Sequence, residues 1–170
     1  LLLLGDVAFW NIFGQDRAAA QLYFLQPLQL RTVVAGKNIA AGIAVLLEVT
    51  GVVAVWAALR LPVSPGRITE AYLAPAILCI SFMAMGNLAS VYFPRAVSSE
   101  KATGAGSSGR FRVLLFPLLP VVSLPVLLAY LSRYAFRSQL AFYLVLGFAA
   151  VLNAAIYWFA LQTAVTKAEE

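Results

Sequence analysis

Four apolar segments, each long enough to cross a lipid bilayer, constrain this chain more than any other feature. They span residues 39–59, 71–93, 113–131 and 140–165. A helix of about 20 residues covers the ~30 Å hydrocarbon core, and lipid offers no partner for a free backbone N–H. The sequence therefore predicts an all-α integral membrane protein with about four complete transmembrane helices.

An apolar stretch at residues 1–13 adds a partial N-terminal span. Because it is too short to cross the bilayer alone, we interpret residues 1–170 as one transmembrane domain from a longer protein.

The composition disfavours several classes of function. Of the 170 residues, 62% are hydrophobic and 11% are charged, whereas soluble domains carry about 25% charged residues. The chain has no His and a single Cys, Cys79, so the commonest general base and the usual zinc ligands are missing. We expect no catalytic residue, no metal site and no cofactor bound by this chain.

The net charge of +5 points to lipid rather than to nucleic acid, because the basic residues lie beside the apolar spans. The connections alternate sides of the bilayer, and one side carries eight basic residues against four on the other. The eight basic residues are Arg17, Arg31, Lys37, Arg95, Lys101, Arg110, Arg112 and Lys167. The positive-inside rule places the side with more basic residues in the cytoplasm. The sequence thus predicts a multi-pass protein of the cell's inner (plasma) membrane.

The connection at residues 94–112 contains a glycine pattern that resembles a nucleotide-binding motif. Gly104-Ala-Gly106-Ser-Ser-Gly109 matches G-x-G-x-x-G, but it lies between two spans and not between a strand and a helix. The chain also lacks the phosphate-binding sequence G-x-x-x-x-G-K-[ST]. We interpret residues 94–112 as a flexible cytoplasmic linker, and any ATP must be bound by another polypeptide.

Glu48 is the clearest charge inside a predicted span. Gly36, Ala40 and Ala44 precede it at intervals of four, and such small residues permit close helix contact. We therefore expect Glu48 to face a neighbouring helix or a cavity. It is either a carboxylate of a transport path or gate, or an interior Glu that holds helices together.

Other polar and aromatic residues in the spans are expected to have mainly structural roles. Asn87 and Asn153 are further intramembrane polar candidates, and we expect them to make hydrogen bonds between helices. Tyr157 and Trp158 are expected to be packing residues or interface anchors, with a platform for a ligand as the alternative. Three prolines in the third predicted span indicate a kinked helix or a broken, re-entrant segment. They are Pro117, Pro120 and Pro125.

A polar stretch between the partial span and the first complete span predicts a short cytoplasmic helix. Residues 16–26 place Ala18, Leu22 and Leu25 on one face, which is typical of an amphipathic helix in the membrane interface. Pro27 ends this helix because proline lacks the backbone donor. An ordinary interfacial loop is the alternative that periodicity leaves open.

Several short motifs in the first half of the chain follow a recognisable order. They are Asn11-Ile-Phe-Gly14-Gln-Asp16-Arg17, Leu25-Gln-Pro27-Leu28, Arg31, Gly36-Lys37-Asn38 and Val91-Tyr92-Phe93-Pro94-Arg95. In this order they resemble the permease subunit of ABC-2 type exporters, over residues 11–97 or about half of the chain. The chain is similar to the C-terminal portion of such a permease, without its first spans or a large extracellular domain.

The resemblance implies partners and a coupling site. Permeases of this family pair with a separate ABC ATP-binding subunit and with a second permease half, as a homo- or heterodimer. A cytoplasmic coupling helix docks on the ATP-binding subunit and transmits its closure. Carried over to this chain, residues 14–31 are the cytoplasmic coupling segment. Its contact residues are Asp16, Arg17, Tyr23, Gln26, Pro27 and Arg31.

We therefore expect the permease subunit of an ATP-driven exporter, which moves an unidentified substrate by alternating access while another polypeptide hydrolyses ATP. The alternative is a non-transporting membrane scaffold or assembly subunit. A membrane enzyme acting on lipid is disfavoured because the chain has no His and no paired carboxylates on one span. A secondary transporter would need ion-coupling charges near the membrane centre. Glu48 is a single such charge, which gives little support to that class.

Overall fold

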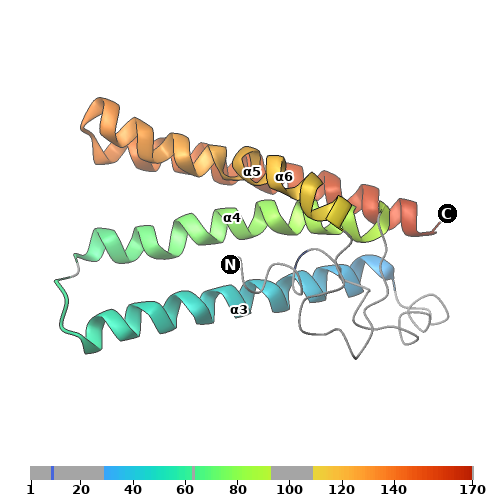
Figure 1. Cartoon of the computed structure of the whole chain (residues 1–170), viewed down its shortest axis with the longest axis horizontal. Helices are drawn as coiled ribbons and strands as arrows, with labels where there is room; N and C mark the ends of the chain where they lie inside the picture. The colour runs from blue at the N-terminus through green and yellow to red at the C-terminus, as the bar shows by residue number, and fades with distance from the viewer. Residues whose placement is uncertain (1–8, 10–28, 63, 93–108, 170) are drawn as a thin grey trace.

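The computed structural model of this chain describes residue 9 and residues 29–62, 64–92 and 109–169. Four helices form within these ranges: α3 (Leu30–Ala58), α4 (Pro65–Tyr92), α5 (Gly109–Phe136) and α6 (Gln139–Glu169). The α3–α4 turn and the α5–α6 turn lie at the same end of the bundle (Figure 1), which we call the hairpin end. Helices that follow one another are therefore antiparallel, and α4 and α6 run parallel.

Similar residues form both turns at the hairpin end. Arg60 and Arg137 follow α3 and α5 with positive φ angles of 53° and 49°, the left-handed geometry that commonly ends a helix. Ser64 and Ser138 precede α4 and α6, and each Oγ accepts the backbone N–H three residues further on at 3.4 Å. The four residues therefore define where one helix stops and the next begins.

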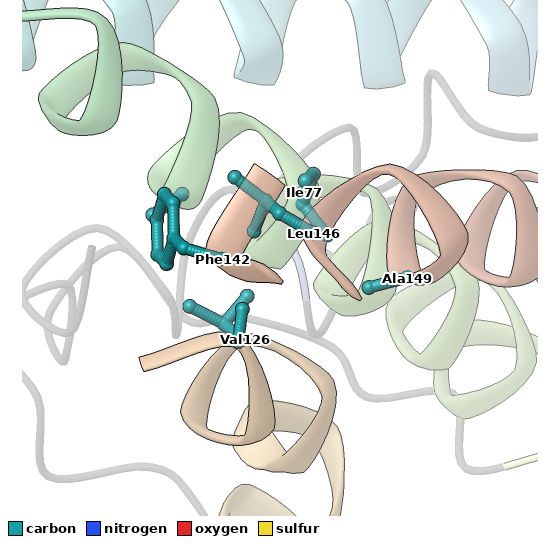
Figure 2. Close-up of a cluster of buried hydrophobic side chains, with 7 residues drawn as sticks. Ile77, Val126, Phe142, Leu146 and Ala149 are labelled. Atoms are coloured by element: carbon teal, nitrogen blue, oxygen red, sulfur yellow. The ribbon is translucent and has the colours of Figure 1, made fainter. Parts of the chain in front are cut away.

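The helices α4 and α6 form the most extensive contact, with α3 and α5 each packed against both of them. Figure 2 shows the core where α4, α5 and α6 meet. Phe142, Leu146 and Ala149 lie on one face of α6, at the spacing of successive helical turns, and all three are buried. Ile77 of α4 and Val126 of α5 belong to the same cluster.

All four helices are long and apolar enough to cross a membrane, which indicates a multi-pass membrane protein. Their burial differs. In the most apolar 18-residue stretch of each helix, 56% of the residues are buried for α4 but only 11% for α3 and for α5. Thus α4 is the central helix, and α3 and α5 present apolar surface to lipid or to another subunit.

The helices begin earlier than the apolar segments that predicted them. The first begins at Leu30 and not at residue 39, and the second begins at Pro65 and not at residue 71. Apolar content marks only the part of a helix inside the hydrocarbon, whereas its hydrogen-bonded turns continue into the polar interface. As a result Asn38 and Glu70, which the sequence had placed in connections, belong to helices.

The prolines of α5 do not interrupt it: the helix is continuous from Gly109 to Phe136. A broken or re-entrant segment is therefore not what the structure shows. Each proline removes one backbone donor but holds φ near the helical value, and membrane helices tolerate the loss. Residues 109–112 of the predicted linker form the start of α5, whereas residues 94–108 lie outside the described part of the chain.

Two further predictions fall mainly outside the described residues. The predicted amphipathic helix at residues 16–26 lies wholly outside them, and the partial span at 1–13 is described only at Phe9.

Candidate functional site

Polar side chains from three helices meet inside the bundle, away from the hairpin end. Nδ2 of Asn38 on α3 donates to Oδ1 of Asn87 on α4 at 3.0 Å and to Oη of Tyr157 on α6 at 3.1 Å. Asn38 and Asn87 are 3% and 1% exposed. Asn87 therefore makes a hydrogen bond between helices of the kind expected from the sequence. The hydroxyl of Tyr157, which we expected mainly to pack or to anchor, accepts a hydrogen bond from Asn38.

A fourth polar side chain, Asn153 of α6, lies one helical turn from Tyr157 on the same face and is buried. Within the described part of the chain, the buried Nδ2 atoms of Asn87 and Asn153 have no hydrogen-bond partner. An unsatisfied buried donor costs about 1–3 kcal/mol, so each atom favours an acceptor. We call Asn38, Asn87, Asn153 and Tyr157 the amide cluster.

The chemistry of the amide cluster suits a neutral ligand. Its two unsatisfied amide groups are donors, so they complement an acceptor oxygen such as that of water, a carbonyl or a hydroxyl group. The cluster contains no carboxylate, imidazole or amine, so its described polar groups are amides and one hydroxyl. Among the described residues, no three His, Cys, Asp or Glu side chains are grouped to hold a metal ion.

Gly86, beside Asn87 on α4, is in direct contact with the backbone of Phe9. The carbonyl oxygen of Phe9 occupies the space where a Cβ atom on Gly86 would lie. The ring of Phe9 packs on Phe82 with 5.9 Å between ring centroids, and Phe9 is 2% exposed. Glycine is therefore required here because any side chain would displace Phe9.

A second group of polar side chains joins α4, α5 and α6 near the hairpin end. Nη1 of Arg133 lies 2.8 Å from both carboxylate oxygens of Glu70, and Nε2 of Gln139 donates to Oε1 of Glu70 at 2.6 Å. The guanidinium carbon of Arg133 lies 5.1 Å from the ring centroids of Tyr130 and Phe142. We call Glu70, Arg133 and Gln139 the salt-bridge cluster.

The two clusters are well separated along the bundle. At a rise of 1.5 Å per residue, Glu70 and Asn87 lie about 25 Å apart on α4. This distance approaches the ~30 Å thickness of a hydrocarbon core, so the clusters lie towards opposite ends of the membrane-spanning part of the bundle.

Glu48 is exposed on α3 and lines an open groove of about 740 Å³ between α3 and α4. It contributes the only charged side chain among the described residues that line this groove, which include Trp56, Ala71 and Pro75. The structure thus places Glu48 at an open groove and apart from both polar clusters, and its expected role in a path or between helices stays a prediction.

The small-residue face that precedes Glu48 is not the buried face of α3. Gly36 and Ala40 are exposed, and among the described residues nothing outside the local backbone of α3 lies within 4 Å of the position of a Cβ on Gly36. The described part of the chain therefore shows no close contact between Gly36 and another helix. A different face of α3 packs against α4 and α6. It consists of Leu30, Val34, Asn38, Ala41 and Val45.

Most of the predicted coupling surface lies outside the described residues, and only Arg31 is inside them. Arg31 is in the first turn of α3, with its guanidinium carbon 4.4 Å from the ring centroid of Trp158 on α6. Such a cation–π contact joins α3 to α6, so Arg31 has a contact inside the chain. The other five predicted residues are Asp16, Arg17, Tyr23, Gln26 and Pro27.

Sequence reasoning missed the salt-bridge cluster and the part that Asn38 plays in the amide cluster. The available signal was the rule that charges near the ends of spans pair with one another. By this rule Arg67, Arg133 and Arg137 are all possible partners for Glu70. The choice depends on the rotation of each helix about its axis, which the sequence does not show.

No protein-family model, curated protein or solved structure matches this chain.

Proposed function

We propose that this chain is the membrane-spanning permease subunit of an ATP-driven ABC exporter in the inner (plasma) membrane. It would move its substrate by alternating access, with a second permease half and a separate ATP-binding subunit. The amide cluster carries this proposal. Polar side chains are costly inside a membrane and are typical of substrate pathways.

The unsatisfied donors favour a pathway over a purely structural cluster. A cluster that only holds helices together gains most when every buried donor has an acceptor. Among the described residues, the Nδ2 atoms of Asn87 and Asn153 have none. In the proposal these two groups bind acceptor oxygens of a passing ligand.

The lack of carboxylate and imidazole side chains in the amide cluster supports an external energy source. Proton-coupled transporters use Asp, Glu or His relays inside the membrane, and the cluster contains none of these residues. Since the sequence has no phosphate-binding loop, ATP would be hydrolysed by the partner subunit.

The helix α3 offers a mechanical route from the proposed coupling segment to the amide cluster. It follows residues 14–28 in the sequence, and Arg31 in its first turn contacts Trp158 of α6. About two turns further along α3, Asn38 is bonded to Asn87 and Tyr157. In the proposal, movement of the coupling segment shifts α3 and changes these hydrogen bonds.

One observation favours the alternative of a non-transporting scaffold or assembly subunit. The spans of α3 and α5 are only 11% buried in their most apolar windows, which leaves broad surfaces for other membrane proteins. A scaffold would use these faces and need no ligand at the amide cluster.

The proposal can be tested by co-expressing the full-length protein with the ATP-binding subunit encoded beside it. We expect Arg17→Glu to weaken complex formation and to reduce the ATPase activity of reconstituted complexes. Arg67→Glu, at the hairpin end on the opposite side, is the matched control. Unchanged complex formation and ATPase activity in Arg17→Glu would contradict the coupling assignment.

The same experiment separates the two candidate functions. If no ATP-binding subunit co-purifies with the full-length protein, the exporter proposal fails and the scaffold remains. If the complex forms, substrate-stimulated ATPase activity should fall in Asn153→Leu, because one of the proposed ligand donors is lost.

A further inference from the structure

We propose that the α5–α6 turn holds a binding site for the phosphate group of an anionic phospholipid. A pocket of about 750 Å³ lies at this turn. Its described lining contains two guanidinium groups and two phenols but no carboxylate. The lining residues are Tyr130, Arg133, Tyr134, Ala135 and Arg137. This site is independent of the proposed transport function.

Arg133 is held in place before any ligand binds. Its pair with Glu70 uses Nη1, whereas a guanidinium has five N–H donors, so Nη2 and Nε are not needed for that pair. The rings of Tyr130 and Phe142 lie 5.1 Å from the guanidinium carbon. A side chain already ordered in this way loses little conformational entropy when it binds an anion.

The charge of the pocket fits a phosphodiester. Glu70 compensates the charge of Arg133, so Arg137 supplies an excess of one positive charge at this turn. A phosphodiester group carries one negative charge, and arginine binds phosphate oxygens through charge-assisted hydrogen bonds. The hydroxyl groups of Tyr130 and Tyr134 add donors to the same pocket.

The surroundings of the pocket favour a lipid over free phosphate. Leu131, Phe136 and Leu140 are 51%, 73% and 68% exposed and lie on the same end of α5 and α6. These side chains can contact acyl chains while the phosphate occupies the pocket. Tyr134, 85% exposed, has the amphipathic character of residues found at the level of lipid headgroups.

The test measures which lipids the protein retains. Full-length protein is equilibrated with vesicles of equal parts phosphatidylglycerol and phosphatidylcholine, purified, and its bound lipids are quantified by mass spectrometry. We expect phosphatidylglycerol to be enriched, and Arg137→Gln to reduce this enrichment about fivefold. Arg60→Gln is the matched control, because Arg60 has the same left-handed geometry at the other turn.

Tyr134→Phe serves as a second variant that leaves an exposed ring in place, and we expect a smaller loss of enrichment. Equal retention of both lipids by the wild-type protein would overturn the proposal. So would an equal loss in Arg137→Gln and Arg60→Gln. Displacement of phosphatidylglycerol by millimolar inorganic phosphate would show that the ligand is a soluble phosphate and would overturn the lipid assignment.

Discussion

The salt-bridge cluster and the amide cluster each join three helices, but they differ in charge and in hydrogen bonding. The carboxylate of Glu70 accepts hydrogen bonds from Arg133 and Gln139. In the amide cluster, two buried donors have no partner among the described residues. The side chain of Arg133 remains 37% exposed beside the hairpin end, whereas Asn87 is 1% exposed.

This difference indicates different tasks. An ion pair is tolerated where one partner still contacts solvent or headgroups, and it then holds helices together. A neutral amide can be buried more deeply, because an unpaired amide costs less than an unpaired charge. The salt-bridge cluster therefore fits a structural role, whereas the amide cluster is the part of the bundle to which we propose a ligand binds.

Glu70→Leu is expected to have the largest effect, lowering the free energy of unfolding by about 2–3 kcal/mol. Leucine removes the acceptor for Gln139 and leaves the guanidinium of Arg133 without its counter-charge. Unfolding of detergent-solubilised protein, followed by circular dichroism, measures the change. Glu48→Leu in the exposed groove is the control, and an equal loss in both variants would refute the structural role.

Gly86→Ala tests the packing beside Asn87 of the amide cluster. It is expected to lower the free energy of unfolding by about 2 kcal/mol. The new methyl group would overlap the carbonyl of Phe9, and that backbone must move. Gly51→Ala has no atom within 4 Å of the new Cβ and should stabilise the protein by up to about 1 kcal/mol. The same unfolding experiment compares them, and a neutral Gly86→Ala would show that Phe9 is not seated there.

Asn87→Leu is expected to lower the free energy of unfolding by about 1 kcal/mol, the usual size of a hydrogen bond between membrane helices. The reason is the loss of the acceptor for Asn38. Asn153→Leu should instead raise the free energy of unfolding by about 1 kcal/mol, because it removes a buried Nδ2 donor that has no partner in the described part of the chain. If Asn153→Leu destabilises as much as Asn87→Leu, then Asn153 is structural and the comparison between the clusters fails.

Arg60→Gly should have the smallest effect, a gain of about 0.5 kcal/mol. Arg60 has a φ of 53°, which costs an L-residue about 1 kcal/mol, but glycine also gains entropy in the unfolded state. The change lies at the hairpin end yet outside the salt-bridge cluster. Melting temperatures in detergent would detect it, and a loss of stability would show that the Arg60 side chain makes a contact worth more than the strain.

The apolar segments predicted the number and type of the spans because the requirement for about 20 apolar residues acts on the sequence directly. The same apolar segments placed the starts of α3 and α4 too late, because they mark only the part of each helix that lies inside the hydrocarbon core. Asn87 could be predicted to bond another helix because a polar group in lipid needs a partner. Its actual partner, Asn38, had been assigned to a connection and was missed.

The sequence by itself determined that this chain is helical and apolar, that it has no His, and that few polar side chains lie within its spans. Only the tertiary structure decided which of these side chains meet. A helix turns by about 100° per residue, so partners on different helices depend on rotation and on where each helix begins. That is why Glu70 faces Arg133, and why Asn38, Asn87 and Tyr157 converge while Glu48 lies apart in the groove.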